Sequence, residues 1–386
     1  MNIDNILSKI YNSEIYYEAV DQEINDIVDM IRKGYSSEQI NRKRNPDFKY
    51  LFEFAKSRIR VSRKFTYADH LFLDYYSSMY STPEIIGKYR AQRLKGHHII
   101  DAGSGAGMQD IVFAKYSDVI GIEMNKSRYL MALLNRIPYQ STANFINEDF
   151  FNYSGDFRDS VIFSDPLRPS NSKEKYFSQL SPNPLDSISI SDNIFGYAID
   201  LPPHIKWENI LLKGEKEYIS INGNLNRLTV YSPSLSTEES TAVILPENII
   251  YSGKPDEFKK SLSPEYKNFE YLFMPDISVV YAKLLNDIID PAWKMIYLDQ
   301  KRYVFAGNSE LKTFPGTQYS VIDFSDDLNI EHKLAKCDGG KVFFRFNMNP
   351  DEMYIHKNAL EKNLTGSKNI YVFKSEKGYI LAEKLE

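Results

Sequence analysis

The chain has 386 residues, more than one hydrophobic core usually organises, and this length predicts two or three domains. Its 42% hydrophobic and 14% aromatic residues exclude a disordered protein, and a formal net charge of −5 means that a nucleic-acid partner would need a local basic patch. One cysteine, Cys337, excludes an internal disulfide and a multi-thiolate zinc site.

The six histidines show no metal-ligand spacing, so no metal site is predicted. The first residues lack a cationic start followed by an apolar run, and no segment approaches about 18 consecutive apolar residues. We therefore expect neither export nor a membrane span, and we place the protein in the cytoplasm. The sequence does not indicate an oligomeric state.

Residues 1–80 are predicted to form a helical N-terminal domain. Apolar residues recur there at three- and four-residue steps, namely Ile6, Ile10, Ile24, Ile27, Val28 and Ile31, followed by Leu51, Phe54, Ala55 and Ile59. Gly34 is expected to end the helix before it. The next helix should be capped by Ser81 or Thr82 and run to about Leu94.

From His97 onward, apolar strands alternate with helical patterns, which predicts a mostly parallel sheet in an α/β domain over residues 81–254. The pattern breaks near Ser252 and again near Thr313, which gives two smaller segments, 255–312 and 313–386. The last segment holds three β-rich runs separated by helical stretches, as expected of a small α/β module.

The strongest local signal is the turn from Asp101 through Gly103, Gly105 and Gly107, placed where a buried strand passes into a helix. Glycines allow the backbone to approach a ligand closely. A dinucleotide-binding turn would have a third glycine where Met108 stands. The sequence of this turn favours S-adenosylmethionine over NAD as the cofactor.

Acidic residues follow the next strands at their carboxyl ends. Glu123 stands where a carboxylate can accept hydrogen bonds from both ribose hydroxyls, and Asp149 can meet an adenine amino group beside Phe150. Asp165 ends a further strand. In an open α/β sheet these ends form the ligand crevice, so we expect Asp101 and the three later acids to line one site.

The chain resembles class I S-adenosylmethionine-dependent methyltransferases that carry a C-terminal THUMP-like domain. The resemblance covers Ser81 to Arg90, Asp101 to Gly107, Glu123, Asp149, Asp165 to Arg168, Tyr218 to Gly223, Tyr271 to Asp276 and the β-rich tail. It implies a Rossmann-like core after the helical domain, then ferredoxin-like and THUMP-like modules. It also implies these cofactor-binding residues: Asp101, Gly103, Gly105, Gly107, Glu123, Met124, Asp149 and Phe150.

The same resemblance places Asp165 toward the methyl acceptor, where it would steady the attacking amine. Amino-group methylases of nucleic acids often carry a second proline and an aromatic ring in this turn, where the chain has Leu167 and Arg168. Arg168 is predicted either to orient a phosphate or base edge or to form an ordinary ion pair. The tail has Val342 to Phe346 where RNA-binding relatives tend to have a basic run, and its net charge from Val321 onward is −1.

A basic segment extends from Arg42 to Lys64, with nine cations against two acids and with aromatic rings interleaved. Such a segment is typical either of RNA binding or of an amphipathic helix with a solvated basic face. We predict a methyltransferase acting on a base nitrogen of structured RNA such as tRNA. The alternatives are a protein or small-metabolite methyltransferase, or a non-catalytic RNA-binding protein that retains the cofactor fold.

Overall fold

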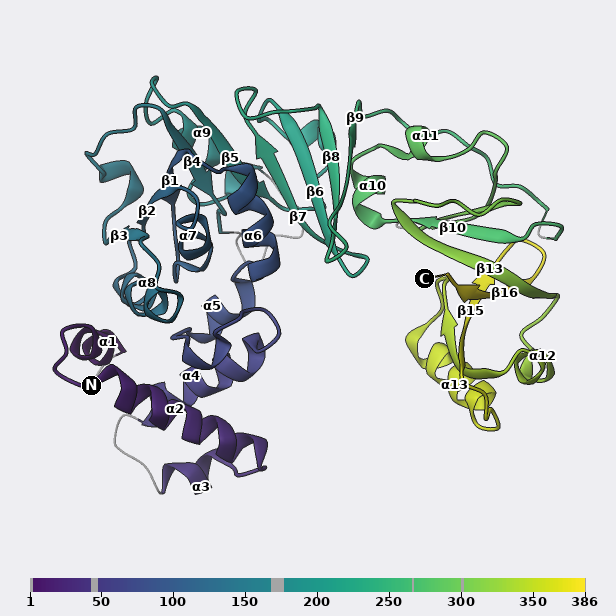
Figure 1. The fold of residues 1–386 in the computed structure, drawn as a ribbon, viewed down its shortest axis with the longest axis horizontal. Helices are drawn as coiled ribbons and strands as arrows, with labels where there is room; N and C mark the ends of the chain where they lie inside the picture. The colour runs from purple at the N-terminus through teal and green to yellow at the C-terminus, as the bar shows by residue number, and fades with distance from the viewer. Residues whose placement is uncertain (1–2, 43–47, 168–176, 266, 300–301, 386) are drawn as a thin grey trace. The chain divides into compact units, whose positions relative to one another are not determined.

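The computed structural model describes residues 3–42, 48–167, 177–265, 267–299 and 302–385. The chain forms two compact units (Figure 1). The first unit comprises Met1–Glu215 and Leu228–Ser236, and the second comprises Lys216–Arg227 and Thr237–Glu386. In the described part of the chain, no helix has both the length and the apolar character needed to cross a bilayer.

The first unit begins with helices, as predicted. They are α1 (Ile3–Tyr11), α2 (Tyr17–Arg32), α3 (Ser37–Asn41), α4 (Phe48–Val61), the 3-10 helix η1 (Ala68–His70) and α5 (Tyr75–Tyr80). Gly34 has φ +85° just after α2, a conformation that favours glycine and ends the helix where the sequence predicted. Ser36 and Gln39 form a capping box at the start of α3.

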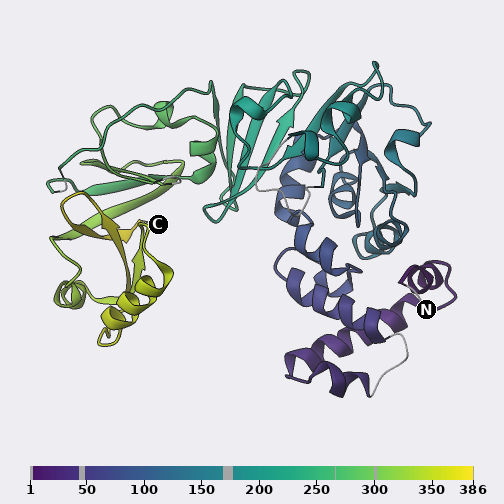
Figure 2. The same cartoon turned by 180° about the vertical axis from the view of Figure 1, so that it is seen from behind.

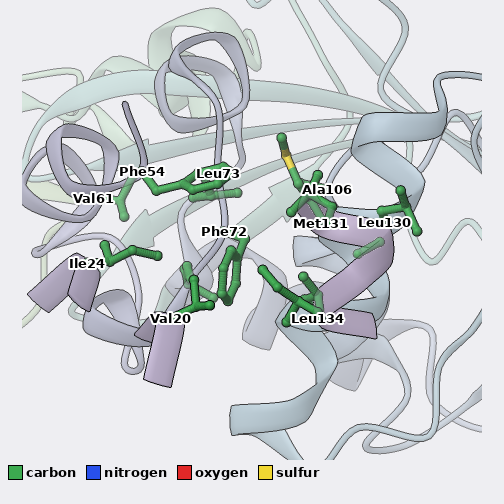
Figure 3. Packing of buried hydrophobic residues seen from close by; sticks show 14 of the residues in the cluster. Val20, Ile24, Phe54, Val61, Phe72, Leu73, Ala106, Leu130, Met131 and Leu134 are labelled. Atoms are coloured by element: carbon green, nitrogen blue, oxygen red, sulfur yellow. The ribbon is translucent and has the colours of Figure 1, made fainter. Parts of the chain in front are cut away.

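These helices share one apolar cluster with the sheet domain. Phe54 and Phe72 meet edge to face at 5.4 Å, and on the other side of the cluster lie Leu130 and Leu134 of α8 (Lys126–Tyr139) (Figure 3). Helix α1 also lies against α8 in both views (Figure 1 and Figure 2). The helical segment is therefore packed on the sheet domain through a continuous core.

The sheet of the first unit has the strand order β3-β2-β1-β4-β5-β7, in which β1 to β5 are parallel and β7 is antiparallel to β5. The strands are β1 (His98–Ala102), β2 (Asp118–Ile122), β3 (Asn144–Ile146), β4 (Ser160–Ser164), β5 (Gly196–Leu201) and β7 (Asn224–Tyr231), accompanied by α6 (Glu84–Arg93), α7 (Met108–Phe113) and α9 (Pro184–Ile188). This order confirms the predicted Rossmann-like architecture, and it reverses between β1 and β4, where ligands bind in such sheets.

The predicted side-chain cap of α6 is wrong. Pro83 occupies the N-cap position and provides no side-chain hydrogen bond. The Thr82 hydroxyl instead donates to Asp165 Oδ2 at 3.5 Å, and Glu84 accepts hydrogen bonds from the backbone N–H and the hydroxyl of Thr66. These long-range contacts replace the local cap that the sequence indicated.

The second unit contains β6 (Glu215–Ile221), β8 (Ser240–Leu245) and β9 (Ile249–Gly253), and a seven-stranded sheet with the order β11-β12-β10-β13-β16-β15-β14. The strands of that sheet are β10 (Tyr271–Pro275), β11 (Lys294–Leu298), β12 (Tyr303–Gly307), β13 (Gly316–Ser325), β14 (Gly339–Phe344), β15 (Lys368–Lys374) and β16 (Tyr379–Lys384). The helices of the second unit are α10 (Ile277–Tyr281), α11 (Leu285–Ile288), α12 (Glu331–Lys336) and α13 (Pro350–Glu361). The division at residues 80, 254 and 312 stays a prediction.

Candidate functional site

The glycine turn joins the end of β1 to α7. Gly103, Gly105 and Gly107 have φ values of +109°, +57° and +77°, which side-chain-bearing residues rarely adopt. A Cβ on Gly107 would lie 2.6 Å from the Phe145 ring, so this glycine is also required by packing. A Cβ on Gly105 would meet nothing within 4 Å. The turn therefore leaves open space beside Gly105.

Glu123 lies at the end of β2 and holds this turn. Its Oε2 accepts a hydrogen bond from the Gly105 N–H at 2.9 Å, and its Oε1 accepts one from the Asn125 N–H at 2.7 Å. Asn147, just after β3, donates to the Glu123 carbonyl at 2.8 Å. The carboxylate is thus fixed at the edge of the turn, and each of its oxygens has a further lone pair for a ligand hydroxyl.

Asp101 is the last residue but one of β1 and is buried, as is Asp110 of α7. Burial raises the pKa of Asp101 well above its ordinary value, and the neighbouring Asp110 raises it further. Burial also raises the pKa of Asp110, to about 7. Neither Asp110 oxygen has a hydrogen-bond partner among the described residues, and a proton held by one carboxyl of the pair would supply the donor that both lack when ionised. Asp110 is a site residue that the sequence analysis missed.

Asp165, the predicted acceptor residue, follows β4 and is partly buried. Burial and Asp110 raise the pKa of Asp101 most. The negative charges of Asp165 and Glu123 raise it further. In the parallel register Asp101 lies opposite Gly121, two residues before Glu123, and opposite Phe163, two residues before Asp165, so the three predicted acids lie at the same edge of neighbouring strands. Arg168, the other predicted catalytic residue, lies outside the described residues.

The remaining predicted cofactor residues differ in exposure. Met124 is 71% exposed beside Glu123, whereas Phe150 is buried in the apolar cluster that contains Ile162. The Asp149 carboxylate accepts a hydrogen bond from the Phe151 N–H at 3.0 Å, and Phe151 itself is exposed. The exposed aromatic face after β3 is therefore that of Phe151, one residue beyond the predicted Phe150.

Part of the predicted basic segment is structural. The Arg58 side chain is 0% exposed, and its Nη2 donates to Asp21 Oδ1 at 2.7 Å while its Nε donates to the Leu71 carbonyl. Phe54 is buried in the helical core. The interpretation of Arg58 and Phe54 as RNA contacts is wrong, because both side chains pack inside the protein. Lys43 and Arg44 lie outside the described residues.

Among the described cations of this segment, the exposed ones are Arg42, Lys49, Lys56 and Arg63. Arg60 and Lys64 are partly buried and bind the next helix: Arg60 donates to the Ser78 hydroxyl, and Lys64 donates to the carbonyls of Ser78 and Met79. The basic face of α4 is therefore narrower than the count of cations indicates.

Comparison with known proteins gives a relative and a structural neighbour. The chain is 30% identical to trimethylguanosine synthase of Schizosaccharomyces pombe (strain 972 / ATCC 24843) over 171 residues, which cover 41% of this chain and 69% of that protein. A crystal structure of a putative methyltransferase from Porphyromonas gingivalis W83 matches with a TM-score of 0.68 at 16% identity, over 95% of this chain and 98% of that one. No family model matches the chain.

Proposed function

Because the chain belongs to the class I S-adenosylmethionine-dependent methyltransferases, together with its trimethylguanosine synthase relative, we propose that it methylates a base nitrogen of structured RNA such as tRNA. The name of that relative denotes a methylated nucleoside, which supports a base as the acceptor. The observation that carries the proposal is that Asp101, Glu123 and Asp165 lie at the carboxyl edge of three neighbouring parallel strands, with Glu123 bound to the glycine turn.

The residues at this edge fit the cofactor. Asp101 Oδ1 and Ser104 Oγ are buried and have no hydrogen-bond partner among the described side chains, and the space beside Gly105 is open. We assign Glu123 to the ribose hydroxyls and Asp149 to the adenine amino group, with Met124 and the exposed Phe151, in place of the buried Phe150, flanking the base. Gly103 and Gly107 shape the turn. S-adenosylmethionine, when bound, supplies the electrophilic methyl carbon of its sulfonium.

On the acceptor side, we assign Asp165 to the attacking amine. Its carboxylate would accept a hydrogen bond from the amine N–H and hold the nitrogen in line with the methyl carbon. Alignment of this kind is worth about 7 to 11 kcal/mol in intramolecular reactions. Arg168 belongs to the proposal as the residue that orients a phosphate or base edge. The exposed cations from Arg42 to Arg63 would attract the RNA backbone.

The second unit enters the proposal through its tail. We interpret residues 313–386 as a THUMP-like module and residues 255–312 as a ferredoxin-like segment, on the basis of the alternating strands and helices of that sheet. An RNA substrate is consistent with the cytoplasm as the location. The tail is acidic overall, so the proposal assigns RNA attraction to the first unit.

The cofactor assignment is tested by Gly105→Ala, with Gly34→Ala as the matched control. Both glycines have positive φ and open surroundings, so both substitutions cost about 1 to 2 kcal/mol of backbone strain. A methyl group at residue 105 points into the proposed cofactor space, whereas one at residue 34 does not. Calorimetry should show at least about tenfold weaker S-adenosylhomocysteine binding by Gly105→Ala alone. Equal affinities of the two variants would contradict the site.

The acceptor assignment is tested with tritiated S-adenosylmethionine and unmodified total tRNA. We expect label in RNA, and about a 100-fold lower kcat for Asp165→Ala because the amine loses its acceptor. Asp165→Asn keeps one acceptor oxygen and should recover part of the rate. Asp156→Ala, at an exposed carboxylate, is the control. Label only in protein or small molecules would contradict an RNA substrate.

A further inference from the structure

The turn after β4 carries no aromatic ring in its described part. It has Asp165, Pro166 and Leu167, and Leu167 pairs through its backbone with Ser181. A base that leaves its stack to reach an active site needs an aromatic or apolar surface to lie on. If the acceptor is a base, any stacking surface for it among the described residues would come from another element.

Helix α5 brings tyrosines to the acceptor residue. The Thr82 hydroxyl contacts Asp165, and Tyr80 precedes Thr82 by two residues, which limits their Cα separation to about 7 Å. Tyr76 lies one turn earlier on the same face, and its ring centroid is 4.5 Å from that of Tyr80. The Tyr80 side chain is 60% exposed. The pair therefore offers an accessible aromatic surface near Asp165.

Arg128 connects this pair to the cofactor edge. It lies in the first turn of α8, which begins three residues after Glu123, and its guanidinium is 4.8 Å from the Tyr76 ring centroid. Burial raises the pKa of Tyr76, Arg128 lowers it, and the charges of Tyr80 and Asp165 raise it again. The ring contact with Arg128 therefore joins Tyr76 to α8, independently of the Thr82 contact with Asp165.

Helix α5 is itself held firmly. Asp74 caps it by accepting a hydrogen bond from the Ser77 N–H at 2.6 Å. Lys64 donates to the carbonyls of Ser78 and Met79, and Arg60 donates to the Ser78 hydroxyl. The tyrosines thus project from a fixed helix, which reduces the entropy lost when a base binds to them.

We propose that Tyr76 and Tyr80 of α5 form the stacking surface for the acceptor base, in place of an aromatic residue in the turn after Asp165. The inference rests on the proposed function and deepens it. The base lies against the Tyr80 ring with its amino group toward Asp165, and Arg128 supports the Tyr76 ring from α8. Base stacking on an aromatic side chain tolerates any base, so this surface contributes affinity for unpaired bases in general.

The test measures kcat and KM for unmodified tRNA with Tyr80→Ala, Tyr76→Ala and Tyr80→Phe. Loss of one stacking contact should raise KM about 5- to 100-fold, with S-adenosylhomocysteine affinity unchanged. Tyr80→Phe keeps the ring and should keep the wild-type KM. The matched control is Tyr75→Ala, since Tyr75 lies on the same helix and is 56% exposed, but its ring packs against Arg60 at 4.7 Å.

The outcomes separate this inference from the proposed function. If the wild type labels RNA and both alanine variants keep its KM, the stacking surface is wrong and the proposed function stands. The same holds if Tyr75→Ala raises KM as much as Tyr80→Ala does. If the wild type labels no RNA, the proposed function fails and the inference fails with it. Unchanged thermal midpoints of the variants exclude unfolding as the cause of a raised KM.

Discussion

Asp101 and Asp110 form a buried carboxyl pair at the start of the glycine turn. Neither Asp110 oxygen has a hydrogen-bond donor among the described residues when both groups are ionised. A proton on one carboxyl provides the missing donor, in agreement with the raised pKa values of both. The cofactor site therefore contains a titrating group close to neutral pH.

Asp110→Asn should make stability less dependent on pH. A carboxyl whose pKa rises on folding binds its proton more tightly in the folded state. For Asp110, stabilisation is therefore fully present below the ordinary pKa of 3.8 and is lost as pH rises through about 7. One such group contributes a slope of at most about 1.4 kcal/mol per pH unit. Urea unfolding between pH 4 and 8 should show a smaller decline for the variant.

Asp156→Asn is the control for this experiment, because Arg158 lowers the pKa of the exposed Asp156 to about 2. That substitution leaves the slope between pH 4 and 8 unchanged. Equal slopes for wild type and Asp110→Asn would contradict the shared proton. The asparagine amide can also donate to Asp101, so the variant should bind S-adenosylhomocysteine with less pH dependence.

For single residues, the sequence predicted the features that depend on local backbone conformation. The three glycines of the turn adopt positive φ, and this requirement is visible in their spacing. Asp110 was missed because its importance arises from burial against Asp101 rather than from a motif. The Thr82 contact with Asp165 was missed because 83 residues separate the two in sequence.

Among the helices and strands, α4 shows why a count of charges overestimated the number of cations that face solvent. Arg58 follows Phe54 by four residues and precedes Val61 by three, so it lies on the apolar face. A cation on that face requires a buried partner, and Asp21 of α2 supplies it. The helical period of the sequence contained this signal, although the partner could not be identified without the structure.

Strand β5 shows the opposite case, in which a strand was not predicted. Its sequence contains Gly196 and Asp200, residues that are depleted in strands. Asp200 is nevertheless buried, because Arg90 Nη2 donates to it at 2.6 Å and Thr229 donates at 2.8 Å. Partners on α6 and β7 make this carboxylate compatible with the centre of the sheet, and neither is near it in sequence.

For the whole molecule, both units present exposed cations, and what distinguishes them is how these cations are arranged. The exposed cations Lys49, Lys56 and Arg63 follow one another at seven-residue intervals in the first unit, with Lys49 and Lys56 on one face of α4. The tail of the second unit also carries exposed lysines, for example Lys341, Lys374 and Lys377, among a slight excess of acids. The two units have nearly equal formal net charges, −2 and −3, so net charge does not indicate which unit attracts RNA.

The salt dependence of tRNA binding should identify the unit that contacts the phosphates. Each lost phosphate contact lowers the slope of log Kd against log salt by about 0.7 to 0.9. Replacing Lys49, Lys56 and Arg63 together by glutamine should therefore reduce that slope by about 2 to 3. The matched triple replacement of Lys341, Lys374 and Lys377 in the tail should leave it unchanged. If only the tail replacement lowers the slope, RNA attraction belongs to the second unit and its THUMP-like interpretation gains support.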